Sequence, residues 1–239
     1  MKHLSKVLLL SAAIFGFSSV AAQAASFKAD LGALSGSGVT GTALLDLSDD
    51  HETLTVTTNV AGLEPNQDHV QHIHGLFDAS GAIADSMTPT LDDDADGDGF
   101  IELLEGVPKY GPIILPLAVI NTPDGNASVT TTYDLTDPTI FGSRPGTDVP
   151  FSAADLMSLT FREVVVHGRS VDAGIGAGTP NEVDGTGGYL AVLPVAAGEI
   201  EAVDAAAVPE PDAIATLVLV GVVGGVAILR RQKSLTAAS

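Results

Sequence analysis

The sequence predicts an all-β domain, an antiparallel Greek-key sandwich or barrel of about eight strands. Short runs rich in Val, Ile, Leu and Thr recur along the chain, and clusters of Gly, Pro, Asn and Asp separate them. No stretch in this region keeps a helical period of about 3.6 residues, which disfavours an α/β scheme. The predicted strands cover residues 27–34, 39–47, 53–60, 69–74, 113–119, 127–135, 159–167 and 188–195.

Two of these runs also show which face each strand turns to water. Residues 53–60 and 129–135 partly alternate polar and apolar side chains, which is typical of a strand with one solvated face. Residues 25–201 together have the length of one domain with a sizeable core. We therefore expect a single β domain over this range.

The N-terminal 24 residues predict a secretory signal peptide. Lys2 and Lys6 form a positive segment, residues 7–17 are apolar, and Ala22-Gln23-Ala24 fits a small-residue cleavage site. An uncleaved membrane anchor is the alternative, but the apolar stretch is short and the cleavage pattern follows it. The mature chain is expected to begin near Ala25.

The C-terminal segment has three parts in a fixed order. A linker over residues 202–212 ends in Val208-Pro209-Glu210-Pro211, and the apolar run 213–229 follows it. We expect this run of 17 residues to form one C-terminal transmembrane helix, which would span roughly 25 Å and barely cross a bilayer. Residues 230–239 begin with Arg230 and Arg231, so we expect this tail to stay in the cytoplasm. A buried core helix is the alternative.

This tail resembles the PEP-CTERM sorting signal of bacterial surface proteins. The resemblance rests on Pro209-Glu210-Pro211, the membrane-length run and the basic cluster after it. It implies that the secretion machinery exports the protein and that a membrane-embedded exosortase removes the tail. The expected route is a precursor tethered to the inner membrane, then release to the cell surface or extracellular matrix. There, extracellular polysaccharide or envelope components are the expected partners.

The expected mature chain is strongly acidic. Residues 25–208 contain five basic and 28 acidic side chains, a formal charge of −23. This balance disfavours nucleic acid and anionic lipid as partners and favours cations. Because the chain has no cysteine, packing and metal ions, not disulfides, are expected to hold the domain together.

An acidic segment, the insertion 92–106, predicts a calcium site. The spacing of its acidic residues and glycine fills every position of an EF-hand loop. The flanking residues, which include Gly106 and Pro108, make poor helices. We therefore expect an isolated Ca²⁺ loop inserted between strands; an acidic surface loop without a specific ion is the alternative. The expected ligands are Asp94, Asp96, Asp98, Phe100 through its carbonyl, Glu102 and Glu105, with Gly99 at the sharp turn.

Histidines form the second candidate metal site. His72 and His74 are two residues apart, so on a strand both imidazoles project from one face. His167 ends a later strand, and three neutral imidazoles suit Cu²⁺ or Zn²⁺. The alternative is a pair of half-exposed strand histidines whose rings are hydrogen-bonded.

The domain is similar to CHRD (chordin-type) domains. The pieces that carry this similarity are Ser35-Gly36, residues 39–43, 54–56, 61–63, His72-Ile73-His74-Gly75 and residues 164–168. The two histidine pieces and the glycine-rich residues 185–188 also resemble Cu,Zn superoxide dismutase, an eight-stranded Greek-key barrel. On that resemblance His72, His74 and His167 match three of its copper ligands.

The chain also departs from the dismutase pattern. No histidine lies between Gly75 and Phe161, so the bridging and remaining zinc histidines have no counterpart, and the disulfide is missing. Tyr189-Leu190 stands where that family has an arginine, and the acidic surface repels an anion such as superoxide. We expect a binding or structural role and no enzyme activity. The alternatives are a Cu/Zn dismutase-like enzyme and a copper or zinc scavenging module.

Overall fold

The structure, a computed structural model, describes residues 25–203, which form an antiparallel β domain. Every strand pairing in it is antiparallel, which confirms this part of the predicted fold class. The strands are β1 (Ala25–Ala33), β2 (Thr40–Leu47), β3 (Thr53–Ala61), β4 (Gln71–Phe77), β5 (Ile83–Ala84), β6 (Ile113–Pro116), β7 (Asn126–Asp134), β8 (Arg162–Val171) and β9 (Gly188–Ala202).

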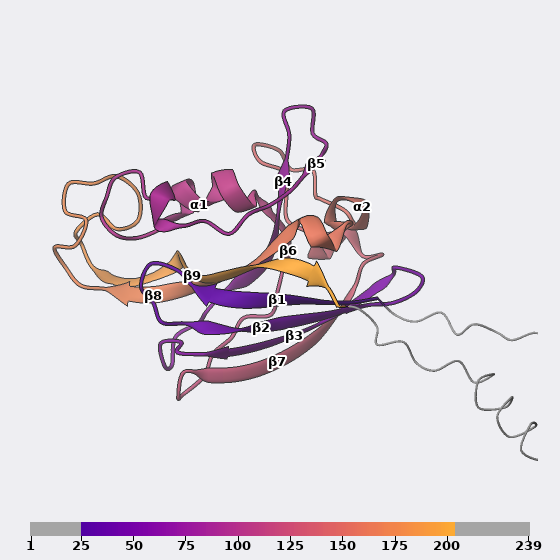
Figure 1. The fold of residues 1–239 in the computed structure, drawn as a ribbon, viewed down its shortest axis with the longest axis horizontal. Coiled ribbons are helices and arrows are strands. Elements are labelled where there is room, and N and C mark those ends of the chain that lie inside the picture. Colours follow the sequence, from indigo (N-terminus) through magenta and orange to yellow (C-terminus); the bar gives the residue numbers. More distant parts are fainter. Residues whose placement is uncertain (1–24, 204–239) are drawn as a thin grey trace, which may run out of the picture.

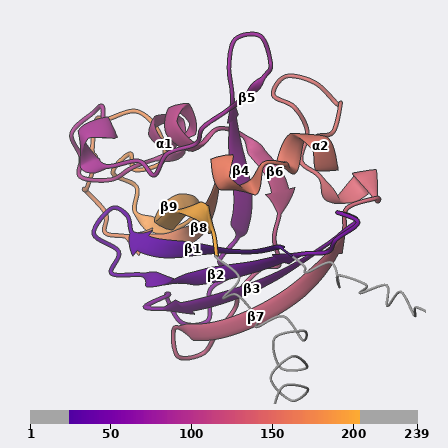
Figure 2. The same cartoon turned by 45° about the vertical axis from the view of Figure 1, so that its right-hand side comes forward.

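These strands make one open, strongly bent sheet. Their order is β5-β4-β8-β9-β1-β2-β3-β7, and β6 pairs with β4 outside this path. Strands β1, β2, β3 and β7 form one layer, while β4 and β6 stand steeply against it on the other side of the bend (Figure 1). The same two layers are visible after a turn of 45° (Figure 2). Because β7 and β5 end the order without pairing to each other, the sheet is not closed into a barrel.

The main core fills the space inside this bend. The alternation in β3 gives one buried face, with Leu54, Val56 and Val60 at 4% exposure or less, and one hydroxyl-rich face. Ile73 of β4 and Val164 of β8 close the core from the other layer. The other face of β8 is buried as well, so that strand is covered on both sides over most of its length.

The structure corrects the predicted strand set in several places, and β8 continues past His167 to Val171. There are nine strands, since the two-residue β5 has no signal of its own in the sequence. Residues 159–161 form a 3-10 turn, and strand β8 begins after it at Arg162. Strand β9 continues to Ala202, the first residue of the predicted linker, because its end pairs with Phe27 of β1.

A second correction concerns helices. Helix α1 (Leu103–Tyr110) follows the acidic loop and runs through Gly106 and Pro108, where the sequence predicted an early end. Proline there gives up the hydrogen bond to the Leu104 carbonyl, but burial of Tyr110 against the sheet offsets this loss. Helix α2 (Ala153–Leu156) and the 3-10 turns Leu91–Asp93 and Pro138–Ile140 complete the described elements.

The predicted signal peptide, residues 1–24, and the segments from 204 onward lie outside the described residues. These segments comprise the rest of the linker, the sorting motif, the apolar run 213–229 and the basic tail 230–239. Within residues 25–203, none of the helices is both long and apolar enough to cross a membrane.

Candidate metal centre

Three histidines meet on one face of the sheet where β4 and β8 lie side by side. His72 and His74 project from that face of β4, and Val165 of β8 is the direct partner of His72. His167, two residues beyond Val165, projects the same way, and the pairing of β8 with β9 shifts register on both sides of it. Ring centroids lie 5.1 to 5.9 Å apart. One possible ligand atom from each histidine lies within 4.8 Å of the others.

Two backbone carbonyls orient these rings. Nδ1 of His74 lies 2.8 Å from the Gly111 carbonyl oxygen, and Nδ1 of His167 lies 2.7 Å from that of Val192. A carbonyl can only accept, so both Nδ1 atoms carry the hydrogen and both Nε2 atoms keep a lone pair. Nε2 of His74, Nε2 of His167 and Nδ1 of His72 are buried, with no hydrogen-bond partner among residues 25–203.

Burial keeps all three imidazoles neutral. It lowers the pKa of His72 to about 4 and that of His167 to about 3. The pKa of His74 falls well below its usual value, first through burial and then through the neighbouring His167. At neutral pH every ring therefore offers a lone pair without first losing a proton.

This donor set fits Cu²⁺ or Zn²⁺. Three unpaired, buried nitrogen atoms that converge are costly unless something binds them, and imidazole nitrogen is a preferred ligand of both metals. A bound ion about 2.0–2.1 Å from each nitrogen would draw the three to within roughly 4 Å of one another. His72 is the most exposed of the three side chains.

Several residues that support the site carry no obvious signal in the sequence. The Tyr110 ring packs edge-on against His74, with centroids 4.5 Å apart, and it comes from helix α1. The carbonyls of Gly111 and Val192 lie far from the histidines in the chain, and any residue type supplies a carbonyl. Gly168, by contrast, directly follows His167, and its φ of 106° marks the local bend.

His69, which precedes the histidine pair in the sequence, lies outside the cluster. It is fully buried, and its Nδ1 and Nε2 lie 3.1 and 2.9 Å from the carbonyl oxygens of His167 and Glu64. A neutral imidazole can donate to only one of these two carbonyls. His69 contacts the backbone at His167 and does not belong to the histidine group that could share one metal ion.

Glu163 is a buried acid directly opposite His74 on β8. Its side chain is 0% exposed, one carboxylate oxygen accepts a hydrogen bond from Thr88 Oγ1, and the other has no partner among the described residues. Burial, more than the nearby Glu199, raises its pKa to about 8. The native protein therefore prefers the protonated acid at this position.

We expect Glu163→Gln to remove a loss of stability at high pH. The folded pKa of about 8 lies above the usual 4.5, so the folded state holds an extra proton between these values. Stability is then lost as the pH rises through this window. Urea unfolding of metal-free protein should show Glu163→Gln gaining roughly 2–4 kcal/mol relative to the parent between pH 5 and pH 9. Glu199→Gln, at the exposed partner position on β9, should gain little. An unchanged pH dependence in Glu163→Gln would contradict this account.

The acidic loop lies between β5 and α1, and its carboxylates form two overlapping groups. Asp94, Asp96 and Glu105 offer oxygens within 4.8 Å of one another, and so do Asp96, Asp98 and Glu102. One oxygen of Asp96 and one of Asp98 are buried without a partner among the described residues. Burial is the main cause that raises the pKa of Asp98, followed by its acidic neighbours. The five predicted carboxylates thus surround one region.

Backbone geometry in this loop follows the predicted turn. Gly99 has a φ of 92°, and its N–H donates to Asp94 Oδ2 at 2.8 Å. Glu105 accepts from the N–H groups of Ala95 and Glu102, at 2.7 and 3.0 Å. Phe100, expected to contribute its carbonyl, buries its ring beneath the Arg169 guanidinium, 5.3 Å from the ring centroid.

The loop is also tied to the connection between β8 and β9. Glu102 is fully buried, and its carboxylate accepts from Val183 N at 2.7 Å and from Asn181 Nδ2 at 3.1 Å. On its other side, Ile101 N donates to Ser35 Oγ at 2.8 Å. The acidic loop is therefore anchored to two separate connections of the fold.

Comparison with known proteins gives little beyond the geometry. No protein-family model matches the chain, and no curated protein matches it. Among solved structures, the Cu(II) form of superoxide dismutase 5 from Candida albicans is similar at 13% identity and a TM-score of 0.32. That match covers 78% of this chain and 97% of the other. A likeness this low carries no argument about activity.

Proposed function

We propose that this chain is an exported β domain that holds one Cu²⁺ or Zn²⁺ ion at His72, His74 and His167, in a binding or structural role. The observation that carries the proposal is the convergence of three buried imidazole nitrogens without hydrogen-bond partners. Two of the rings are fixed by backbone carbonyls, so the site is preorganised for a metal ion.

Binding is favoured over dismutase catalysis by what surrounds the cluster. The two other histidines of residues 25–203 are His51, which is exposed, and His69, whose ring nitrogens contact carbonyl oxygens. Neither belongs to the group of histidines whose nitrogens lie close enough to share an ion. The acidic surface also slows the approach of anions. Copper-loaded protein is accordingly expected to turn over superoxide no faster than the same protein without copper.

A copper titration tests the proposal. Calorimetry at pH 7 should show one Cu²⁺ bound per chain, and His167→Ala should weaken binding by roughly 100-fold or more, since one of three ligands is lost. His51→Asn is the matched control, because His51 is an exposed histidine with a φ of 60° that asparagine tolerates. Equal affinity in parent and His167→Ala protein would overturn the proposal.

A second ion, Ca²⁺, is proposed for the acidic loop, in a role that orders the connection between β5 and β6. Two overlapping carboxylate groups and the positive φ of Gly99 support it. With a Kd around 10⁻⁴ M, 10 mM Ca²⁺ would add about 2.7 kcal/mol of stability. We expect the melting temperature to rise by about 5–10 °C.

The calcium effect has a direct control. Glu105→Gln should abolish the rise in melting temperature, because it removes a charge from the shared centre. Asp92→Asn removes the same charge from an exposed neighbour outside the ligand positions and should keep the rise. If calcium leaves the melting temperature of the parent protein unchanged, the loop holds no calcium.

Export and processing complete the proposal. We infer that secretion machinery removes residues 1–24 and that an exosortase cleaves near Pro209-Glu210-Pro211, delivering the domain to the cell surface or matrix. The Val203 N–H donates to the Ser26 carbonyl at 2.9 Å, so both processed segments join the domain at the same corner. Mass spectrometry of the native protein from cells and medium should find termini near residues 25 and 211. Recovery of only full-length chains would contradict this route.

A further inference from the structure

Strand β7 ends the sheet, and the outward-pointing backbone groups in its middle, from Ser128 to Thr132, are unpaired among the described residues. Leu135 N donates to the Glu52 carbonyl at 2.8 Å, which sets the phase of pairing with β3. The odd-numbered residues of β7 therefore bond to β3, and the even-numbered ones point their N–H and C=O away from it. Within residues 25–203, no hydrogen bond reaches the backbone of Ser128, Thr130 or Thr132. In both views no described element lies beyond β7 (Figures 1 and 2).

This edge lacks the devices that usually protect an edge strand. Proteins discourage pairing at such edges with proline, lysine, bulges or very short strands. Strand β7 has nine residues, no proline or basic residue, and an unbroken register with β3. It presents a regular template for another strand.

The edge is also uncharged in an otherwise acidic protein. From Asn126 to Tyr133 there is no ionisable carboxylate or base, and Asp134 follows at the end of the strand. Elsewhere the acidic surface makes two copies of the chain repel each other. At this edge two copies can approach each other without bringing like charges together.

We propose that β7 is a self-association edge, where a second copy of this chain pairs its own β7 antiparallel about Thr130. This register makes each outward-pointing residue face another outward-pointing one. Thr130 would face Thr130 of the second copy, Ser128 would face Thr132, and Asn126 would face Asp134. Hydroxyls then lie opposite hydroxyls, an amide lies opposite a carboxylate, and no like charges meet. The self-complementary order favours a second copy over an unrelated extended segment.

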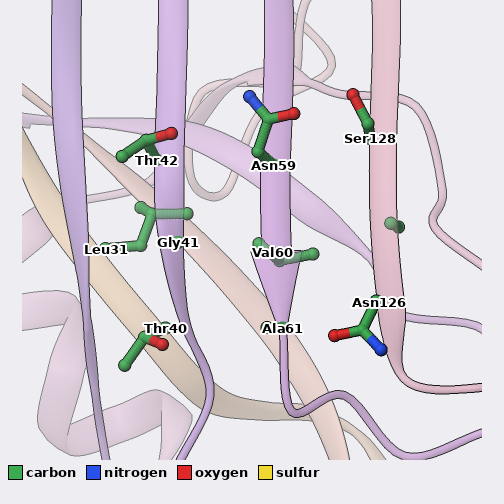
Figure 3. A pocket seen from close by; sticks show the side chains of 10 residues that line it. Leu31, Thr40, Gly41, Thr42, Asn59, Val60, Ala61, Asn126 and Ser128 are labelled. Carbon is green, nitrogen blue, oxygen red and sulfur yellow. The ribbon is translucent and has the colours of Figure 1, made fainter.

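The exposed face beside this edge supports the pairing. Thr57 and Thr130 share a hydroxyl hydrogen bond of 2.9 Å, and Thr55 and Thr132 share one of 3.0 Å. Pairing about Thr130 would continue both rows across the junction. A shallow hollow of about 700 Å³ crosses the same face and reaches β7 at Asn126 and Ser128 (Figure 3). The hydroxyl-rich face would become one surface shared by two copies.

Disulfide trapping tests both the pairing and its register, because the chain has no cysteine of its own. In an antiparallel hydrogen-bonded pair the Cα atoms lie about 5.5 Å apart, within the range of a disulfide. Full-length Thr130→Cys, purified in mild detergent and then oxidised with diamide, should form a covalent dimer. Thr132→Cys should cross-link at least about tenfold more slowly, since the two cysteines would lie about 14 Å apart.

The Thr132→Cys variant is a matched control. Each single variant loses one threonine hydroxyl bond to β3, so their folding should be affected alike. Association elsewhere in the chain, or in the detergent micelle, would cross-link both variants equally. Adding Ser128→Cys to Thr132→Cys should restore the covalent dimer. Equal rates for the two single variants, or no dimer from Thr130→Cys, would overturn the proposal.

Discussion

Replacing Arg162 by alanine is expected to destabilise the domain by about 3–5 kcal/mol. The side chain is 0% exposed, and its guanidinium donates to the carbonyls of Leu156 at 3.3 Å, Met157 at 3.1 Å and Asp155. It also stacks over Phe77, 5.3 Å from the ring centroid. Alanine would leave three carbonyls unpaired and a cavity against the ring, and both effects act in the same direction.

Arg144 provides the control for this change. Its guanidinium pairs with Asp155 at 2.7 Å, but its side chain is 39% exposed. Arg144→Ala should therefore cost roughly 1 kcal/mol or less. Burial lowers the pKa of Arg162 only to about 10, so the group is charged at neutral pH in the parent protein. Urea unfolding midpoints measured at pH 7 test this difference. Similar losses of stability in the two variants would contradict the role given to Arg162.

Replacing Gly111 by alanine should damage both the fold and the histidine cluster. Gly111 has a φ of 81°, and an added Cβ would lie 2.2 Å from the Gly75 carbonyl oxygen. Because the obstacle is backbone, the two segments must separate, at a cost of roughly 2–4 kcal/mol. The Gly111 carbonyl would move with them, and it is the group that orients His74. Copper affinity should fall by about 10- to 100-fold.

Gly146→Ala separates steric overlap from backbone strain. Gly146 also has a positive φ, 72°, but a Cβ there would meet no atom within 4 Å. Its cost should be limited to about 1–2 kcal/mol, with copper affinity unchanged. Urea unfolding and a copper titration on both variants are the measurements. If Gly111→Ala loses stability but binds copper like the parent protein, the Gly111 carbonyl does not set the geometry of His74.

The sequence identified strands where local pattern and tertiary environment agree. In β3, threonine alternates with Leu54 and Val56, and the structure buries the apolar set against the core. His72 and His74 lie two residues apart on a strand, so their common face follows from periodicity alone. Helix α1 was not predicted because it has only eight residues and Pro108 interrupts its helical periodicity. Its stability depends on contacts with distant strands, which no local window contains.

Other parts of the candidate site could not be predicted for a different reason. Glu163 and Arg162 are charged residues whose type predicts exposure, yet both are fully buried. The carbonyls of Gly111 and Val192 belong to the backbone, so side-chain identity carries no information about them. The meeting of His167 with His72 required strand order and register, with β8 placed beside β4. The histidine spacing indicated metal ligands, but only the strand order and register show that His167 lies beside the other two.

Helix α1 connects the acidic insertion to the histidine cluster. The helix begins directly after the acidic loop, with Glu105 in its first turn, and it ends at the Gly111 carbonyl that holds the His74 ring. Eight helical residues separate these ends by roughly 12 Å, a short and stiff spacer. Shortening the loop would therefore be expected to move the Gly111 carbonyl and, with it, the His74 ring. The loop, the helix and the Gly111 carbonyl thus form one continuous stretch of chain that ends at the His74 ring.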